Sequence, residues 1–491
     1  MKFEIPQNVS RVTETLKKCG YDAYLVGGCV RDLIVHTKPK DFDLTTNAKP
    51  EDIVQLFQDN GFKVVYENTF GTVAIIFEDE PLDSNVRQIE ITPYRRETTY
   101  SDNRHPDAIE FAEKLSYDLM RRDFTINALA YDSVSHETID LYNGLDDIKN
   151  KIIKTVGNTD ERFTEDALRM MRAVRFAAQL GYAVSHETLE SILKNKNLLK
   201  NISSERIRDE FVKIITSKEP AIGIGLLKQL GILEIIIPEL LEGDGCEQGG
   251  VHKYDVFTHL VMACQHAADK NFSFHVRLSA LFHDIGKPRT RRPGHKKAWT
   301  FYGHEVVGAR MTQKILERLK FPKADSELIC KFVRWHMFFS DTESITLSAV
   351  RRMIQNVSRD HIWDLMNVRE CDRVGMNKTE APYRLRKYFA MIEECLRDPI
   401  SVSQLKIDGT YLMQNLGVKP GPRMGWMLHA LLEEVLEDPS KNELEYLSKR
   451  VSELEQLSDQ DLKHLGEEGK EKKEKLDEEL VKELHVKHGV K

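Results

Sequence analysis

The chain has 491 residues, of which 41% are hydrophobic and 30% are charged, and its net charge at neutral pH is −7. This length predicts more than one domain, and the composition is typical of a folded globular protein. No apolar run approaches the roughly 20 residues that span a bilayer, and the first ten residues lack the pattern of a signal peptide. The seven scattered cysteines, without a Cys-x-x-Cys pair, indicate reduced thiols. We therefore expect a cytoplasmic protein without a membrane partner.

The first 150 residues mix strands and helices. Runs of β-branched and apolar residues predict strands at 23–26, 72–77 and 88–92, with helical patterns between and after them. From about residue 160 the periodicity is almost wholly helical, and a long helix is expected to begin there. The Glu- and Lys-rich segment 443–491 is expected to be solvated helix or partly disordered.

A glycine turn follows the first predicted strand. Gly27 and Gly28 separate this strand from a predicted helix that contains Arg31. Two glycines allow the backbone to approach a phosphate closely, and amides at a helix N-terminus attract anions. Arg31 adds a bidentate phosphate donor. Such a turn alone is weak evidence, because most glycine pairs are plain turns.

Two acids, Asp41 and Asp43, follow the glycine turn. Residues two apart in an extended strand point to the same face, so these carboxylates would repel each other unless a cation lies between them. Magnesium prefers oxygen ligands, typically one or two carboxylates together with substrate phosphates. The turn and the acids therefore predict two-metal nucleotidyl transfer, in which a 3′-hydroxyl displaces pyrophosphate. Glu90, on a neighbouring predicted strand, is the candidate for a third acid.

Ordered motifs between about residues 15 and 215 resemble those of the bacterial class II CCA-adding tRNA nucleotidyltransferases, in the polymerase-β-like superfamily. The resemblance implies addition of CCA to the 3′ end of tRNA from CTP and ATP, without a nucleic-acid template and with Mg²⁺ as cofactor. The five matching motifs comprise residues 25–32 with 41–43, 121–128, 143–147, 165–169 and 204–210.

The resemblance assigns two more elements of the head. The ribose and triphosphate of the incoming nucleotide would contact Arg122 and Asp123 in the second motif. The polar segment 94–111 resembles the flexible loop that lets the family's pocket change from C to A, and members that add only CC lack it. Its presence favours the full CCA reaction, and a plain surface loop is the alternative.

The fourth motif can be interpreted as a substitute for a template strand. Asp166 and Arg169 stand three positions apart, so we expect both to project from one helix face. A carboxylate accepts from the exocyclic amine of C or A, and a guanidinium donates to the adjacent ring acceptor. U and G would leave both side chains unpaired, at a cost of roughly 1–3 kcal/mol each. Arg172 and Arg175 continue the basic row and are expected to meet the triphosphate.

A second candidate site lies in the helical body and resembles the HD phosphohydrolase superfamily. The signature of that superfamily is carried over as His259, His283, Asp284 and Asp372. His304 and His336 could complete a two-metal site. Imidazole and carboxylate ligands suit a second divalent metal such as Mn²⁺ or Ni²⁺. By resemblance, this site would act on 2′,3′-cyclic or 2′-phosphate RNA ends during tRNA repair.

The resemblance implies an α+β fold class, with a small polymerase-β-like head that contains a mixed sheet and an all-α neck and body. Basic residues near the fourth motif and at 287–292 permit RNA contact, although a solvated loop is the alternative for 287–292. No pattern determines an oligomeric state. The predicted parts are a nucleotidyltransferase head at 1–150, a neck with base recognition at 151–245, an HD-like domain at 246–380 and a helical tail at 381–491.

Three alternatives stay open. The first is a bacterial poly(A) polymerase, which shares the head motifs but tends to carry a basic C-terminal extension, unlike this acidic chain. The second is an RNA-end phosphohydrolase with a degenerate transferase head. The third is a non-catalytic tRNA-binding protein, which the paired acids oppose because acids repel phosphate.

Overall fold

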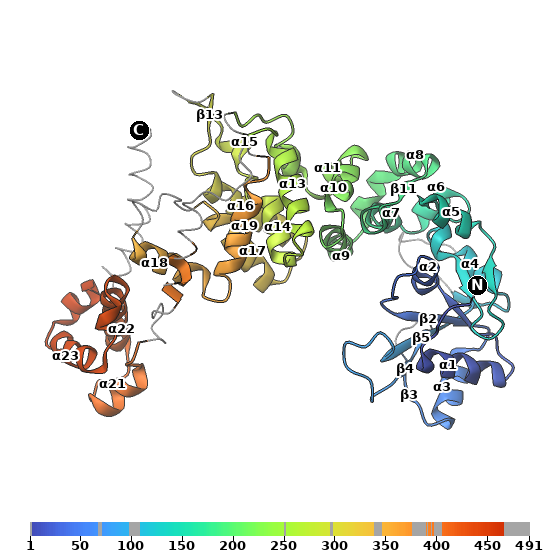
Figure 1. Ribbon diagram of the computed structural model, residues 1–491, viewed down its shortest axis with the longest axis horizontal. Helices are drawn as coiled ribbons and strands as arrows, with labels where there is room; N and C mark the ends of the chain where they lie inside the picture. Colours follow the sequence, from blue (N-terminus) through green and yellow to red (C-terminus); the bar gives the residue numbers. More distant parts are fainter. Residues whose placement is uncertain are drawn as a thin grey trace. The chain divides into compact units, whose positions relative to one another are not determined.

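The computed structural model divides into two compact units, Met1–Cys330 and Lys331–Lys491. The first unit begins with a mixed sheet and continues as helices, and the second unit is helical (Figure 1). This arrangement confirms the α+β class. The structure describes residues 2–66, 71–97, 109–249, 252–294, 298–337, 346–375, 389, 391–393, 395–396 and 405–465.

The head contains a seven-stranded mixed sheet with the order β3-β4-β5-β2-β1-β8-β9. Among the described strands of this sheet, β2 and β5 pair in parallel and the other neighbours are antiparallel. The strands predicted at 23–26, 72–77 and 88–92 are confirmed as β1, β4 and β5. The strands are β1 (Tyr24–Val26), β2 (Phe42–Thr46), β3 (Lys63–Tyr66), β4 (Val73–Ile76), β5 (Gln88–Pro93), β8 (Leu129–Tyr131) and β9 (Thr138–Asp140).

Successive side chains of a strand point to opposite faces of the sheet, so one face contributes to the core of the head and the other to its cleft. On β5, Ile89 and Ile91 are fully buried, whereas Glu90 between them is half-buried. Helix α2 packs on β1, β2 and β8, and α3 packs on β3 and β4. The helices of the head are α1 (Gln7–Lys18), α2 (Gly28–Ile34), α3 (Pro50–Asp59), α4 (Leu115–Met120), the 3₁₀ turn η1 (Thr125–Asn127) and α5 (Gly144–Asn150).

The predicted flexible loop at 94–111 lies mostly outside the described residues, which end at 97 and resume at 109. Its two flanks form a small antiparallel ladder, in which β6 (Arg95–Glu97) pairs with β7 (Ile109–Phe111). The role proposed for this loop in changing the pocket from C to A stays a prediction.

Helices make up most of the first unit after the head. Helix α7 packs against α9 and α10, α10 also packs against α13, and α13 packs against α14. The principal helices are α6 (Thr159–Glu165), α7 (Leu168–Leu180), α8 (His186–Asn195), α9 (Ser204–Ile215), α10 (Pro220–Gln229), α13 (Val256–Asp269), α14 (Phe274–Phe282), α15 (Lys287–Thr290), α16 (His304–Arg318) and α17 (Lys323–Trp335), the last of which continues into the second unit. Short elements between them are η2 (Lys196–Asn201), α11 (Leu233–Ile236) and α12 (Pro238–Leu241).

The expectation of an all-α neck and body needs a small correction. Two-residue ladders join β10 (Ile152–Ile153) to β11 (Ala183–Val184), and β12 (Arg292–Pro293) to β13 (Trp299–Thr300). Strands this short carry too few residues to show a two-residue period in the sequence.

The prediction of one long helix from residue 160 is wrong, because the helix is interrupted at Asp166. Asp166 is extended, with φ −141° and ψ 101°, and separates α6 from α7. Its side chain accepts a hydrogen bond from the amide of Leu168 at 3.1 Å. A short acidic side chain that caps the next helix competes with helix continuation, which explains the break.

In the second unit, residues 405–465 enclose their own apolar core. Leu447, Val451 and Leu454 of α23 are fully buried in it. The tail is therefore helical at 444–455, as expected, but one face is buried rather than solvated. Residues 466–491 lie outside the described part. The helices of this unit are α18 (Leu347–Val357), α19 (Ile362–Cys371), α21 (Gly409–Asn415), α22 (Pro422–Glu437), η4 (Pro439–Lys441) and α23 (Leu444–Glu455). No helix among the described residues is long and apolar enough to cross a bilayer.

Candidate functional site

The sheet brings two of the predicted acids together. Asp43 on β2 and Glu90 on β5 are Cα partners in adjacent parallel strands. Both line a cleft of about 190 Å³, whose other lining residues are Val26, Leu44, Thr72, Thr92, Arg95, Arg121 and Arg122. Asp41 lies just before β2 and is exposed. Carboxylate oxygens at a cleft fit a magnesium ion, and the assignment of these three acids as its ligands stays a prediction.

The glycine turn leaves room for a guanidinium at this cleft. Gly27 has φ +78°, a left-handed conformation that L side chains rarely adopt. A Cβ at Gly27 would lie 3.0 Å from Nη1 of Arg122 and 3.9 Å from Oδ2 of Asp43. Gly28, the next residue, begins α2. The predicted turn therefore lies directly beside the acids and beside a predicted phosphate-binding arginine.

A buried acid that the sequence analysis missed holds the two arginines of the cleft. Asp118 is fully buried and pairs with Nη2 of Arg121 at 2.5 Å and with Nη2 of Arg122 at 3.0 Å. Burial alone would raise the pKa of Asp118, but both arginines outweigh it and lower the pKa. The spacing of three and four residues from Asp118 is a helical pairing pattern that could have indicated this contact.

The buried carboxylate of Asp123 accepts hydrogen bonds from three groups of the protein. Its Oδ1 accepts from the amide of Phe124 at 2.8 Å and from Nδ2 of Asn127 at 3.1 Å, and its Oδ2 accepts from Nε of Arg172 at 2.7 Å. Burial would raise the pKa of Asp123, but Arg172 and Asn127 outweigh it and lower the pKa to about 2. The second motif is thereby tied to α7, and the predicted nucleotide contacts of Asp123 and Arg172 stay predictions.

Two other predicted phosphate donors surround one aromatic ring. Arg31 donates to Oδ1 of Asn127 at 2.7 Å, and its guanidinium carbon lies 5.3 Å from the ring centroid of Phe176. Arg175 lies 4.2 Å from the same centroid and pairs with Glu210 at 3.3 Å. Burial and the neighbouring Arg172 lower the pKa of Arg175 to about 10. Both arginines have partners within the protein, so their contact with a triphosphate stays a prediction.

The two predicted base-selecting residues do not project from one helix. Asp166 lies in the non-helical segment between α6 and α7, and Arg169 lies in α7. Asp166 accepts from Nη2 of Arg206 at 2.8 Å. Arg169 pairs with Glu165 at 2.6 Å and donates to the carbonyl of Arg121 at 3.1 Å. Arg206 lies in the fifth motif, at 204–210. Base selection by Asp166 and Arg169 stays a prediction.

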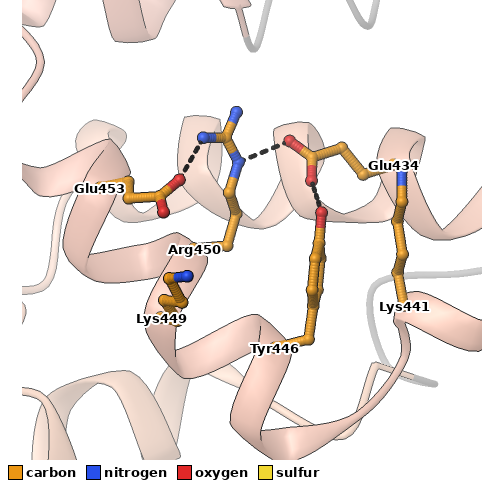
Figure 2. A pocket seen from close by; sticks show the side chains of 6 residues that line it. All are labelled: Glu434, Lys441, Tyr446, Lys449, Arg450 and Glu453. Carbon is orange, nitrogen blue, oxygen red and sulfur yellow. Dashed lines mark hydrogen bonds and ion pairs between the residues drawn. The ribbon is translucent and has the colours of Figure 1, made fainter.

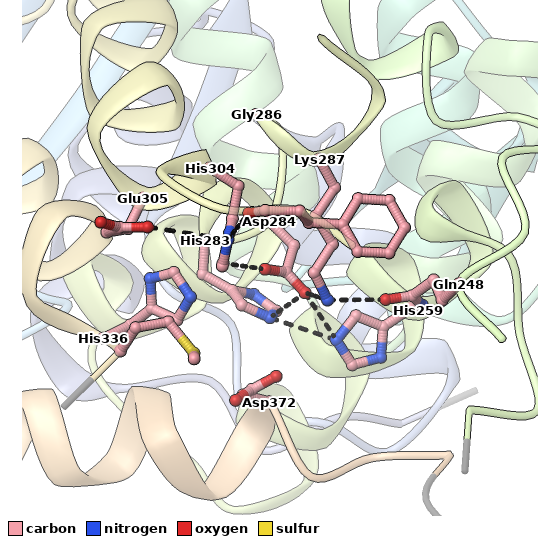
Figure 3. Close-up of polar contacts among 12 residues, drawn as sticks. Gln248, His259, His283, Asp284, Gly286, Lys287, His304, Glu305, His336 and Asp372 are labelled. Carbon is pink, nitrogen blue, oxygen red and sulfur yellow. Dashed lines mark hydrogen bonds and ion pairs between the residues drawn. The ribbon is translucent and has the colours of Figure 1, made fainter. Parts of the chain in front are cut away.

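In the first unit, three residues of the predicted HD set meet as expected. The ligand atoms of His259, His283 and Asp284 lie within 4.8 Å of one another (Figure 3). Nε2 of His283 lies 3.3 Å from Oδ2 of Asp284, and Nε2 of His304 lies 3.1 Å from Oδ1. All four side chains are buried. The carboxylate of Asp284 therefore lies between the imidazoles of His283 and His304.

Backbone carbonyls fix the orientation of these imidazoles. Nδ1 of His283 lies 2.8 Å from the carbonyl of Ala280, and Nδ1 of His304 lies 2.7 Å from that of Phe301. An Nδ1–H that donates to a carbonyl leaves Nε2 as the lone-pair atom, which is the atom directed at Asp284. This donor set fits a divalent metal of the manganese, iron or nickel type.

Gly286 and Lys287 complete the surroundings of Asp284. A Cβ at Gly286 would lie 2.2 Å from the carbonyl of His304, so only glycine lets this turn approach α16. Nζ of Lys287 lies 2.5 Å from Oδ2 of Asp284 and donates to Oε1 of Gln248 at 2.7 Å. Burial would raise the pKa of Asp284, but Lys287 and His283 outweigh it and hold the pKa well below its ordinary value.

The remaining predicted HD residues, Asp372 and His336, belong to the second unit. Asp372 is buried just after α19 and forms an ion pair with Arg369. His336 is buried just after α17, and its Nδ1 lies 2.7 Å from the carbonyl of Val333. The imidazole of His336 is thus oriented by a backbone carbonyl, as are those of His283 and His304. The role of both residues as metal ligands stays a prediction.

The second unit carries a larger cleft, of about 460 Å³, in which most of the charged side chains are paired with one another (Figure 2). Arg450 donates to Glu434 at 2.8 Å and to Glu453 at 2.6 Å, and the hydroxyl of Tyr446 donates to Glu434 at 2.9 Å. Lys441 and Lys449 complete the lining. This mixture of paired acids and bases resembles neither a metal site nor a catalytic dyad.

Comparison with protein families accounts for most of the first unit. Residues 23–154 match the poly A polymerase head domain, 181–243 match the probable RNA and SrmB-binding site of polymerase A, and 251–371 match the HD domain. The acid-lined cleft lies within the first match, and the histidine–aspartate cluster lies within the third. Fold and site together define a nucleotidyltransferase.

Known relatives identify the family. The CCA-adding enzyme of Ligilactobacillus salivarius (strain UCC118) is 32% identical over 453 residues, which cover 90% of this chain and 95% of that relative. The chain belongs to the CCA-adding enzyme family. The CCA-adding enzyme of Lactobacillus helveticus (strain DPC 4571) is 47% identical over 206 residues, so this match spans 41% of the chain and about half, 48%, of the relative.

Solved structures support the same fold. The Bacillus stearothermophilus CCA-adding enzyme in complex with CTP matches with a TM-score of 0.66 and 24% identity, covering 92% of this chain and 99% of that chain. The Thermotoga maritima CCA-adding enzyme complexed with tRNA matches with a TM-score of 0.54 and 18% identity, covering 91% and 94%. At these identities the likeness concerns the fold.

Proposed function

We propose that the chain adds C, C and A to the 3′ end of tRNA, using CTP and ATP without a nucleic-acid template. The observation that carries this proposal is the pairing of Asp43 with Glu90 on adjacent parallel strands, at a cleft that three arginines also line. The solved relatives bound to CTP, to tRNA and to ATP support the choice of substrates. The proposal assigns transfer to residues 1–150, base recognition to 151–245 and a cytoplasmic location to the protein.

The acids and the arginines would divide the work of transfer. Asp41, Asp43 and Glu90 would hold Mg²⁺, which when bound supplies Lewis-acid stabilisation of the triphosphate and of the attacking oxygen. The 3′-oxygen of the tRNA forms a bond to the α-phosphorus, and pyrophosphate leaves. Arg121 and Arg122 would stabilise the negative charge of the leaving pyrophosphate; the support is that both line the cleft with Asp43 and Glu90 and that Asp118 pairs with both.

Base recognition would require an exchange of partners in the neck. Asp166 is bound to Arg206 and Arg169 is bound to Glu165. A cytosine or adenine that meets both side chains replaces these ion pairs with hydrogen bonds to its amine and ring acceptor. Uracil and guanine offer the opposite donor and acceptor pattern, so they would break the ion pairs without replacing them.

The deciding experiment uses tRNA that lacks its 3′ CCA, together with magnesium. With CTP and ATP we expect three additions and then a stop, with CTP alone two additions, and with ATP alone none. Asp41→Ala and Asp43→Asn should abolish addition, whereas Asp79→Asn, at an exposed acid of the same head, should not. Efficient A-tailing of any RNA without prior C addition would instead indicate a poly(A) polymerase.

A second activity is favoured by the buried histidine–aspartate cluster. We propose that the predicted HD residues His259, His283, Asp284 and Asp372 hold Mn²⁺, Ni²⁺ or a similar ion, and that this site hydrolyses 2′,3′-cyclic or 2′-phosphate ends of RNA. His304 and His336 would complete a second metal position. The support is the carbonyl-fixed orientation of His283 and His304 around Asp284.

Metal-loaded protein tested on an RNA with a 2′,3′-cyclic phosphate separates the two activities. Asp284→Asn should abolish hydrolysis and leave CCA addition intact, and Asp43→Asn should do the reverse. Loss of both activities in Asp43→Asn would contradict the separation. An absence of hydrolysis with every divalent metal tried would contradict the second activity alone.

A further inference from the structure

A stacked arginine and tryptophan follow the histidine–aspartate residues His283 and Asp284 in the sequence. Arg291 follows α15, and its guanidinium carbon lies 3.6 Å from the ring centroid of Trp299, the first residue of β13. Both side chains are half-buried. The hairpin that presents them is closed by the pairs Arg292 with Thr300 and Pro293 with Trp299. A flat cationic and aromatic surface of this kind accepts nucleobases by stacking.

Three arginines, Arg289, Arg291 and Arg292, differ in whether a carboxylate compensates their positive charge. Arg289 makes two hydrogen bonds to Glu242, at 2.5 Å and 2.8 Å, so its charge is compensated. Arg291 and Arg292 pair with no carboxylate in the part of the chain that the structure describes. Nε of Arg291 is buried without a hydrogen-bond acceptor among those same residues. Uncompensated guanidinium groups of this kind favour an anionic ligand such as phosphate.

One loop connects the stacked pair to the cluster. Nη1 of Arg291 lies 4.0 Å from the sulfur of Cys246. Gly249 is close enough to Trp299 that a Cβ on it would lie 3.8 Å from Cδ1 of the ring. Gln248, between Cys246 and Gly249, accepts a hydrogen bond from Lys287, which also contacts Asp284. The stacked pair therefore contacts the loop at 246–249 directly, and Lys287 connects the same loop to the cluster.

From these contacts we infer that Arg291, Arg292 and Trp299 bind the last nucleotides of a single-stranded RNA 3′ end and present its terminal phosphate to the cluster at Asp284. The base stacks on the arginine–tryptophan pair, and Arg292 binds the preceding backbone phosphate. This inference rests on the proposed phosphohydrolase activity, and adds the site that selects RNA over a small phosphodiester.

The test compares two substrates of the Mn²⁺-loaded enzyme. One is a short single-stranded RNA with a 2′,3′-cyclic phosphate, and the other is methyl riboside 2′,3′-cyclic phosphate, which presents the same cyclic phosphate without a base or any other aromatic ring. Trp299→Ala should raise the KM for the RNA by roughly 5- to 150-fold, the loss expected for one base stack, and leave its kcat within about twofold. Hydrolysis of the methyl riboside 2′,3′-cyclic phosphate should not change, and Trp299→Phe should restore most of the KM for the RNA.

Arg292→Ala and Arg289→Ala form a matched pair, because both remove one arginine from the same segment. The first should raise the KM for the RNA, and the second should have a smaller effect because Glu242 already compensates Arg289. An unchanged RNA KM in Trp299→Ala would overturn the inference. An equal loss on both substrates would also overturn it, since it would mean that Trp299 only supports the fold of the cluster.

Binding measurements distinguish this inference from the proposed activity on which it rests. A fluorescently labelled RNA tetranucleotide with a 3′-phosphate, followed by anisotropy in the presence of Mn²⁺, reports binding without turnover. If the wild-type protein hydrolyses neither substrate but Trp299→Ala weakens tetranucleotide binding by fivefold or more, the RNA site stands and the hydrolase proposal fails. If the wild type hydrolyses both substrates and Trp299→Ala binds the tetranucleotide normally, the RNA site fails and the hydrolase proposal stands.

Discussion

Asp43 and Glu90 are register partners on β2 and β5, the one parallel pair in the described head sheet. Parallel pairing in register brings side chains of two separate strands to one face at one height. The residues are 47 positions apart in the sequence, yet both line the same cleft. The third acid of the proposed magnesium site is thereby positioned by sheet register.

Glu90→Gln removes a carboxylate oxygen without changing the size of the side chain. We expect kcat for addition of the terminal A to fall by roughly 10- to 100-fold or more, the range for groups that support a metal. Incorporation of labelled ATP into tRNA ending in CC measures the effect, and raised magnesium should recover part of it. Asp79→Asn serves as the control. Activity equal to wild type at low magnesium would remove Glu90 from the metal site.

Asp118→Asn tests how the cleft arginines are held. The substitution leaves Arg121 and Arg122 without a buried counter-charge, so we expect KM for CTP and ATP to rise by about tenfold or more. We also expect the free energy of unfolding to fall by about 3–5 kcal/mol, as for other broken buried ion pairs. Steady-state kinetics and urea unfolding measure the two effects. A stability loss with unchanged KM values would leave Asp118 with a structural role only.

Asp123 should make the stability of the head depend on pH. Its pKa is about 2 in the folded chain against an ordinary value of 3.8, so folding favours the ionised form. The resulting stabilisation, about 2 kcal/mol, is fully present above pH 4 and is lost as the pH falls towards 2. The difference in unfolding free energy between wild type and Asp123→Asn should therefore shrink over that interval. A difference that stays constant from pH 6 to pH 2 would contradict the assignment.

Lys287 should compete with a divalent ion at the second site. Its ammonium lies 2.5 Å from Oδ2 of Asp284, where a metal would need the same oxygen. Lys287→Met should therefore tighten Mn²⁺ binding by about tenfold, equivalent to about 1.4 kcal/mol. Calorimetric titration of EDTA-treated protein measures the affinity, with His283→Ala as the variant expected to lose binding. Weaker binding in Lys287→Met would show that the lysine orients Asp284.

Much of this fold and site could be predicted because the residues concerned carry local signals. The strands at β1, β4 and β5 are rich in β-branched and apolar residues, and the glycine turn follows the first of them directly. The order of His259, His283 and Asp284 is equally visible along the chain, and helices α13 and α14 then bring these residues together. These features could be predicted because their residues lie close together in the sequence or are of types with a specific chemistry, such as glycine, histidine and aspartate.

Other features depend on partners distant in the chain and could not be predicted. The break at Asp166 is accompanied by an ion pair with Arg206, 40 residues later, and by a cap on α7 that a helical period does not reveal. The stack of Arg291 on Trp299 likewise appears only once the hairpin has folded. The basic run at 287–292 was ambiguous in the sequence because charge alone does not distinguish compensated from uncompensated arginines.

The extended residue between α6 and α7 has a consequence for how one pocket can serve two bases. Within a regular helix, a carboxylate keeps a nearly constant direction, since its backbone torsions are locked by the surrounding turns. At a joint, rotations of a few degrees about φ and ψ re-aim the side chain while both flanking helices stay intact. If base selection by Asp166 is as proposed, this joint would let one carboxylate meet a pyrimidine twice and a purine once, while the residues around it keep their secondary structure.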